Sequence, residues 1–284
     1  MRFVTFDLNG KPCPGVLSGD TLLDITSLGF SSLIEVIAAG PEARAKIGNL
    51  VLEPPDAAKQ PLSEAKLLAP IPRPPKVICV GLNYRDHAAE TKARLPTVPT
   101  IFNKFPTAVI GPGANIAIPR LSKAIDYEAE FAFVIGRGGR HIAPGEWPDH
   151  VFGYTIANDV SARDYQRATS QWLMGKTFDT FGPMGPWIAT PDEIEDPHEL
   201  DIRMELNGET MQNSNTRELI FKIPDLIAYL SGVFTLEPGD AILTGTPSGV
   251  GFVREPPRFL QPGDECVVKI KGIGELRNQV IAEA

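Results

Sequence analysis

Proline is the residue that most limits how this chain can fold. The 284 residues include 27 prolines, about twice the usual share. They crowd between residues 54 and 75, where neither a helix nor a central strand is favoured because proline lacks a backbone N–H. We therefore predict an extended crossing there, between a small N-terminal domain at residues 1–70 and a larger domain at residues 71–284.

Short apolar segments separated by Gly, Pro and Asp clusters fill the larger domain and are typical of strands. The strands expected there are Lys76–Val80, Glu128–Ile135, Val151–Asn158, Ile202–Leu206, Ala241–Thr244, Cys266–Ile270 and Leu276–Ile281. Apolar spacing after Pro224 predicts a helix there, and a second helix is expected to begin near Tyr84. The N-terminal domain shows a strand pattern at Arg2–Leu8 and a helix pattern near Ser31–Ala39. The sequence thus predicts an α+β fold that is predominantly β.

Charge and composition exclude several function classes. With 27 basic and 35 acidic residues the net charge is −8, which argues against a nucleic-acid or anionic-membrane surface. The apolar runs are too short to span a membrane, and Asp7 and Asn9 interrupt the first one, so we expect no signal peptide. Cys13, Cys79 and Cys266 show no CxxC spacing, which predicts free, buried thiols and a cytoplasmic location.

Two glutamates form the strongest local signal. In a strand, Glu128 and Glu130 share one face, about 6–7 Å apart along the chain, and that face continues with the apolar Ala132 and Val134. Partly buried carboxylates repel each other unless a cation lies between them, and oxygen ligands suit Mg²⁺, Mn²⁺ or Ca²⁺. The alternative, which the strand alone leaves open, is an exposed pair on a solvated edge.

A polar segment follows the apolar strand Val151–Asn158. Asp159 is placed at the strand end, a rigid position that suits a ligand. Arg163 and Gln166 are three residues apart, so one helical turn puts both on the same side. The alternative is that Asn158 and Asp159 only cap the turn through their side chains.

His87 and Glu90 are also three residues apart, in the segment expected to be helical. A carboxylate beside an imidazole fixes its tautomer and raises its basicity, which a general base requires. The alternative is a surface ion pair on an ordinary helix.

Taken together and in this order, five segments resemble the fumarylacetoacetate hydrolase superfamily. They are Val80–His87, Asp126–Glu130, Asn158–Gln166, Lys176–Pro183 and Leu243–Gly251. The resemblance covers about residues 71–284. It implies a mixed β-sandwich roll, a homodimer, and a member of the acylpyruvate hydrolase or oxaloacetate decarboxylase type with a small α+β domain in front.

The resemblance also assigns roles to residues. It implies that Mg²⁺ or Mn²⁺ binds to Glu128, Glu130 and Asp159. The implied catalytic residues are His87 and Glu90 on a mobile lid together with Lys176, and the implied substrate-binding residues are Arg85, Arg163, Gln166 and Thr246.

The activity implied is hydrolysis of a C–C bond in a 2,4-dioxo acid such as an acylpyruvate, through an enolate that the metal stabilises as a Lewis acid. His87 would then deprotonate water, while Lys176 and Arg163 hold anionic oxygens. On the same metal site, the alternatives are an oxaloacetate decarboxylase or tautomerase, or an isomerase or hydratase of a dienoic 2-oxo acid. An alternative of another class is a small-acid-binding protein without catalysis.

Overall fold

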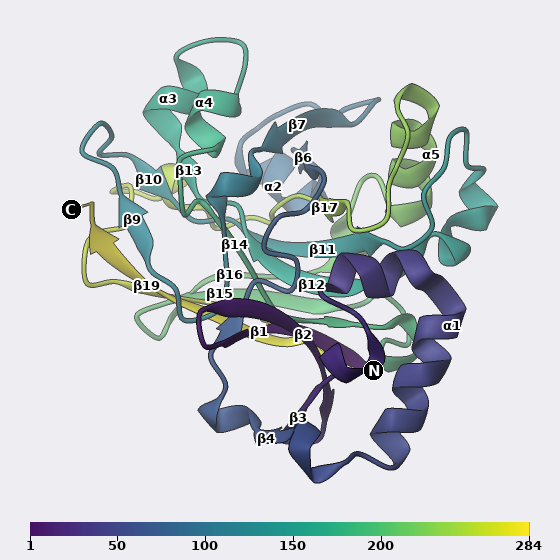
Figure 1. The fold of residues 1–284 in the computed structure, drawn as a ribbon. Helices are drawn as coiled ribbons and strands as arrows, with labels where there is room; N and C mark the ends of the chain where they lie inside the picture. Colours follow the sequence, from purple (N-terminus) through teal and green to yellow (C-terminus); the bar gives the residue numbers. More distant parts are fainter. Residues whose placement is uncertain (284) are drawn as a thin grey trace.

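The structure is a computed structural model that describes residues 1–283, and within them the strands form three sheets (Figure 1). The largest sheet runs in the order β4 (Lys59–Pro61), β3 (Thr21–Asp24), β2 (Lys11–Ser18), β1 (Arg2–Leu8), β14 (Gly182–Ala189), β12 (Val151–Asn158), β11 (Ala129–Ile135), β17 (Ala241–Leu243), β6 (Val77–Gly81) and β7 (Thr100–Lys104). Beside it, β5 (Leu67–Leu68) pairs with β1 and β8 (Val109–Ile110) pairs with β14. The second sheet is β16 (Glu209–Asn215), β15 (Asp201–Leu206), β18 (Glu265–Ile270), β19 (Gly274–Ala282) and β9 (Ile116–Ile118), and the third is β10 (Ile125–Asp126) with β13 (Ser161–Ala162).

The centre of the large sheet packs on the second sheet. Strands β11, β12 and β14 contact β15, β18 and β19, which gives a two-layer sandwich. One face of β11 supplies the predicted apolar residues Phe131, Phe133 and Ile135, all completely buried between the layers. Burying a side chain of this size stabilises the fold by about 1.5–3 kcal/mol. The predicted α+β class, predominantly β, is therefore confirmed.

The helices are few and lie outside the sandwich (Figure 1). They are α1 (Leu33–Leu52), α2 (Arg85–Glu90), α3 (Arg163–Arg167), α4 (Leu173–Lys176) and α5 (Ile223–Val233), with short 3₁₀ turns between strands. Both α2 and α5 lie where the sequence predicts them. Within residues 1–283, no helix combines the length and the apolar character needed to cross a membrane.

Helix α1 corrects the prediction that a helix ends at Ala39. The chain kinks at Gly40, whose φ is 63°, and the helix then resumes and continues to Leu52. Glycine with a positive φ commonly ends a helix. Proline suits the first position of a new helix, because the N–H that proline lacks would have no partner there, and this allows the helix to resume at Pro41. The first segment lies where the sequence predicts a helix, and the second segment was not predicted.

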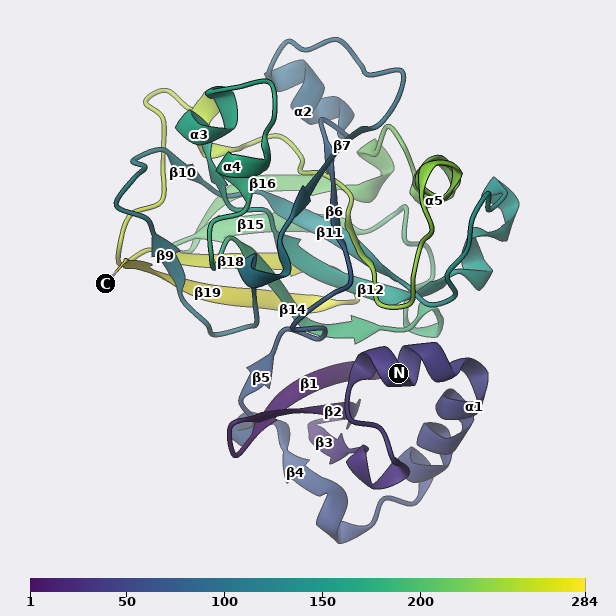
Figure 2. The same ribbon diagram turned by 45° about the horizontal axis from the view of Figure 1, so that its top comes forward.

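The N-terminal strands are continuous with the large sheet. Strand β1 pairs with β2 and also with β14, where Phe3 lies opposite Ile188. Phe3 and Ile188 also belong to one apolar cluster with Val134 and Phe152 of the larger domain. Figure 2 shows the N-terminal unit as a separate lobe on this side of the sandwich. Hydrogen bonds and a core cluster thus join this lobe to the larger unit, and the division at residue 70 stays a prediction.

Strand directions bring several chain segments to one edge of the sheet. Because β11 is antiparallel to both β12 and β17, its beginning lies beside their ends. Strand β6 is parallel to β17, so its end and the start of α2 lie at the same edge. The sequence segments that carry the candidate residues therefore converge.

Candidate active site

Three carboxylates meet where β11 begins and β12 ends. Ligand oxygens of Glu128, Glu130 and Asp159 all lie within 4.8 Å of one another, and all three residues are buried. The backbone N–H of Asp159 donates to the Glu128 carbonyl at 2.9 Å, which holds the two segments together. The structure thus brings together the two acidic segments that the sequence singled out separately.

Three cations, Lys104, Arg163 and Lys176, neutralise part of this cluster. Lys176 Nζ lies 2.7 Å from Glu128 Oε2 and 2.8 Å from Asp159 Oδ2, and Arg163 Nη1 lies 2.6 Å from Glu128 Oε1. Burial alone would raise the pKa of Glu128, but the charges of Lys176 and Arg163 outweigh it and hold the pKa well below its ordinary value. Glu128 is therefore an anion at neutral pH.

Glu130 differs from its two neighbours. Its Oε2 accepts a hydrogen bond of 2.7 Å from the backbone N–H of Gly245, but no cationic side chain in residues 1–283 lies within 4.0 Å of it. Burial first, and then the charges of Asp159 and Glu128, raise the pKa of Glu130 well above its ordinary value. A buried carboxylate with excess negative charge around it and only oxygen donors nearby fits a hard divalent cation such as Mg²⁺ or Mn²⁺.

The predicted pair of His87 and Glu90 lies on α2 and lines the same pocket. His87 Nδ1 is 3.1 Å from Glu90 Oε2, and Glu90 Oε1 accepts a hydrogen bond of 2.8 Å from the Gly249 N–H. This arrangement fixes the tautomer of the ring. Among residues 1–283, no hydrogen-bond partner is recorded for His87 Nε2, so that nitrogen can accept a proton from a molecule in the pocket.

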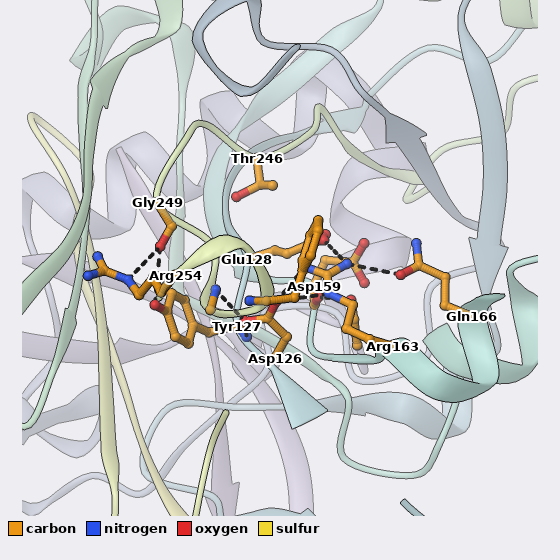
Figure 3. Close-up of polar contacts among 12 residues, drawn as sticks. Asp126, Tyr127, Glu128, Asp159, Arg163, Gln166, Thr246, Gly249 and Arg254 are labelled. Atoms are coloured by element: carbon orange, nitrogen blue, oxygen red, sulfur yellow. Dashed lines mark hydrogen bonds and ion pairs between the residues drawn. The ribbon is translucent and has the colours of Figure 1, made fainter. Parts of the chain in front are cut away.

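Arg163 and Gln166 project from α3 towards the carboxylates (Figure 3). Arg163 Nε donates to Asp126 Oδ2 at 2.8 Å, and Nη1 donates to Gln166 Oε1 at 3.0 Å. Burial opposes the charge on Arg163, but Asp126 and Glu128 prevail and raise its pKa. The guanidinium is therefore a fixed, buried positive charge.

Thr246 lies in the loop after β17 and also lines the pocket (Figure 3). Its hydroxyl donates to the Ala129 carbonyl at 2.9 Å and accepts from Gln212 Nε2 at 2.8 Å. Further along this loop, the Gly249 carbonyl accepts from the Tyr127 hydroxyl at 3.1 Å. A Cβ at Gly249 would come within 2.1 Å of a backbone carbonyl oxygen, so this close approach requires glycine.

Arg85 is the one predicted site residue that the structure places elsewhere. Its Nη1 donates to the Leu219 carbonyl at 2.9 Å, and Arg85 is not among the residues that line the pocket. In the sequence it is only two residues from His87. On a helix that spacing points two side chains in different directions, and the same turn that carries His87 inwards carries Arg85 away.

The pocket lined by Glu128, Glu130 and His87 has a volume of about 500 Å³. Its lining also includes the apolar side chains of Val80, Leu82, Phe102 and Trp172. Small organic acids fit a cavity of this size that combines apolar walls with a few polar and charged groups.

Three buried polar residues that support the site were missed in the sequence. Lys104 Nζ lies 2.6 Å from Asp159 Oδ1, and Gln212 Oε1 accepts from the Ala129 N–H at 2.9 Å. Asp126 binds Arg163 and also accepts from the N–H groups of the loop after β17. For Asp126 a signal existed, because it lies two residues before Glu128 in the same motif. Lys104 and Gln212 come from strands that the sequence pattern did not identify.

Comparison with known protein families shows to which family the chain belongs. The sequence profile described as "Fumarylacetoacetate (FAA) hydrolase C-terminal" matches residues 76–281. The chain belongs to the fumarylacetoacetate hydrolase family. It is thus an enzyme of that family, and the predicted resemblance is confirmed.

Three similar proteins illustrate the range of this family. "Oxaloacetate tautomerase Fahd2a, mitochondrial" of Rattus norvegicus is 51% identical over 222 residues, covering 78% of this chain and 71% of the relative. "Oxaloacetate tautomerase fahd2, mitochondrial" of Xenopus laevis is 44% identical over 99% of this chain and 90% of its own length. The crystal structure of maleylpyruvate hydrolase from Sphingobium, in complex with manganese(II) and pyruvate, is 32% identical, covers both chains fully and has a TM-score of 0.84.

Proposed function

We propose that this enzyme interconverts the keto and enol forms of a small 2-oxo acid, oxaloacetate. The observation that carries the proposal is one pocket lined both by Glu128 and Glu130 of the acidic cluster and by His87 with Glu90. Two relatives of 51% and 44% identity are named oxaloacetate tautomerases, which supports this reaction over the others of the family. It is the decarboxylase or tautomerase alternative of the sequence-based prediction, now preferred to C–C bond hydrolysis.

We further propose that Glu128, Glu130 and Asp159 hold Mg²⁺ or Mn²⁺. The bound ion would supply the Lewis acidity that stabilises negative charge on the substrate's 2-oxo oxygen. The Mn²⁺ and pyruvate in the maleylpyruvate hydrolase structure support this choice of metal.

The chain's own residues account for the proton movement. His87 Nε2 accepts the proton that leaves C3 of the keto acid, while Glu90 stabilises the imidazolium through Nδ1. The imidazolium then returns a proton to the oxygen at C2, so enzyme and substrate exchange no net proton. Gln166 lines the pocket beside Arg163, and its amide N–H groups provide donors for the substrate carboxylate.

Hydrolysis of a C–C bond in an acylpyruvate is the second candidate. The pairing of His87 with Glu90 favours it, because the same imidazole can deprotonate water. The resemblance to a maleylpyruvate hydrolase supports it as well.

A comparison of three rates in the Mg²⁺-loaded enzyme tests the proposal. Enol loss from oxaloacetate is followed by ultraviolet absorbance, pyruvate release by a coupled assay, and acylpyruvate cleavage by loss of its enol absorbance. We expect enol–keto conversion of oxaloacetate to exceed both other rates and the background from Mg²⁺ alone. Acylpyruvate cleavage without any acceleration of enol–keto conversion would contradict the proposal and establish the hydrolase.

We propose that the enzyme is a homodimer, which sedimentation equilibrium tests. We also propose that it binds neither nucleic acid nor membranes. We also propose a cytoplasmic location, supported by Cys13, Cys79 and Cys266, which are all free thiols. Because two relatives are named mitochondrial, cell fractionation decides this point, and co-purification with a mitochondrial matrix marker would contradict it.

A further inference from the structure

Two arginines on α3 face the pocket with very different surroundings. Arg163 is buried and has ion pairs with Asp126 and Glu128. Arg167 also lines the pocket but is exposed, and within residues 1–283 it has no recorded hydrogen bond or ion pair. The charge of the buried Arg163 is therefore largely neutralised, whereas the charge of the exposed Arg167 is not.

The aromatic ring of Phe252 contacts both arginines. The guanidinium carbon of Arg167 lies 4.3 Å from the ring centroid and that of Arg163 lies 4.6 Å from it. Phe252 is itself fixed, because its backbone N–H donates to Asp126 Oδ2 at 3.1 Å. Contact between a cation and the face of a ring restrains the side chain of Arg167 in a position that an isolated surface arginine would not keep.

Helix geometry explains this alignment. Residues four apart lie on the same side of a helix, so Arg167 lies one turn beyond Arg163, with Gln166 beside them. Figure 3 shows Arg163 and Gln166 extending from this helix towards Glu128 and Asp159. Arg167 thus lies one helical turn beyond the arginine that contacts Glu128, and it lines the same pocket.

We propose that Arg167 binds the distal carboxylate of the substrate and so selects 2-oxo dicarboxylic acids over acids with a neutral tail. The inference rests on the proposed function, since it takes the 2-oxo end to lie at the acidic cluster. An unpaired guanidinium can form a bidentate, charge-assisted pair of hydrogen bonds with a carboxylate. Apart from His87, Arg163, Arg167 and Lys176, the side chains that line the pocket offer no cation to such a group.

A matched pair of ligands tests the inference without relying on turnover. Malate and 2-hydroxybutanoate are stable four-carbon 2-hydroxy acids that differ only in the distal group, which is a carboxylate in the first and a methyl in the second. Calorimetry on the Mn²⁺-loaded enzyme gives the dissociation constant of each. The variants are Arg167→Gln, Arg167→Lys and the control Arg73→Gln, which changes an exposed arginine that does not line this pocket.

We expect the wild-type enzyme to bind malate more tightly than 2-hydroxybutanoate. Arg167→Gln should weaken malate binding about tenfold or more, since a hydrogen bond to a charged group is lost, and should leave 2-hydroxybutanoate within about twofold. Arg167→Lys should recover part of the loss, and Arg73→Gln should match the wild type. The KM for oxaloacetate should rise in parallel with malate dissociation, with kcat nearly unchanged.

Three results would overturn the inference. These are equal binding of the two acids by the wild type, unchanged malate binding in Arg167→Gln, or an equal loss for both acids in that variant. Absence of oxaloacetate turnover in the wild type, with the malate preference and its loss in Arg167→Gln still observed, would instead overturn the proposed reaction and keep the role of Arg167.

Discussion

At the scale of single residues, the site is a balance of buried charges. Taking a carboxylate out of water costs several kcal/mol unless partners compensate. Glu128 and Asp159 have such partners in Lys176 and Arg163, while Glu130 has only a backbone N–H. This imbalance is the physical reason to place a divalent cation beside Glu130.

The role of His87 gives a prediction at this scale. His87→Ala should lower kcat for enol–keto conversion of oxaloacetate about 10²–10⁴-fold, because it removes the proton acceptor. Mn²⁺ affinity should stay unchanged, since His87 is not one of the clustered carboxylates. Steady-state kinetics and Mn²⁺ titration check the two parts, and an unchanged kcat would assign the proton transfer to another group.

The sequence predicted most of the site residues but not how they are supported. Glu128, Glu130 and Asp159 lie together because Ala129 of β11 pairs with Asn158 of β12. The alternation of polar and apolar residues and the turn residues after β12 indicate these two strand ends in the sequence. The contacts of Lys104 and Gln212 depend on strands β7 and β16. The contacts themselves join residues far apart in sequence, Lys104 with Asp159 and Gln212 with Ala129, which no local pattern records.

At the scale of elements, local breaks in regular structure have identifiable causes. Helix α1 is two helical segments joined at Gly40, with a positive φ, followed by Pro41. Apolar periodicity predicts where the first segment lies. It does not predict that the chain resumes a helix after the kink, because that depends on the packing of Ala43 and Ile47 in the N-terminal core cluster.

The kink predicts opposite effects for two glycines of the same helix. Gly40→Ala should destabilise the protein by about 1–3 kcal/mol, because a Cβ is strained at this φ. The control is Gly48→Ala, which should be neutral or stabilise by about 0.5–1 kcal/mol, since Gly48 is in the helix interior and a Cβ would make only an ordinary contact. Urea unfolding measures both, and equal effects would show that Gly40 carries no special strain.

The start of α5 predicts a dependence of stability on pH. His198 Nε2 accepts a hydrogen bond of 3.4 Å from the N–H of Ile223, the first residue of α5. Burial first, and then the charge of Lys222, lower the pKa of His198 below its ordinary value of 6.5. A folded-state pKa below the unfolded one means that the contribution to stability is fully present above pH 6.5 and is lost as the pH falls through the folded-state value.

The variant His198→Gln tests this dependence, because glutamine can still accept the hydrogen bond but does not titrate. We expect the free energy of unfolding to fall less in the variant than in the wild type between about pH 7 and pH 5. Urea titrations at the two pH values provide the comparison. The same loss in both proteins would place the acid sensitivity elsewhere.

At the scale of the whole molecule, one sheet and one apolar cluster join the two units. The crossing expected from the proline content stays a prediction, whereas the pairing of Phe3 with Ile188 is observed and joins residues that are remote in sequence. Such a contact follows from the way two surfaces pack, so the composition of either segment alone could not indicate it.

Continuity across the units predicts cooperative unfolding. Calorimetry should show one thermal unfolding transition for the whole chain. Mn²⁺ should raise the midpoint temperature of that single transition, because the cation binds only the folded protein. Two transitions, of which Mn²⁺ moves only one, would show that the N-terminal unit folds independently despite the shared sheet.

The most direct test of the whole account is the position of the metal. Crystals grown with Mn²⁺ are measured at a wavelength where manganese scatters anomalously. We expect one strong anomalous peak between the carboxylates of Glu128, Glu130 and Asp159, and its loss in Glu130→Gln crystals. A map with no peak among these three side chains, or with the peak held by other residues, would contradict the central claim.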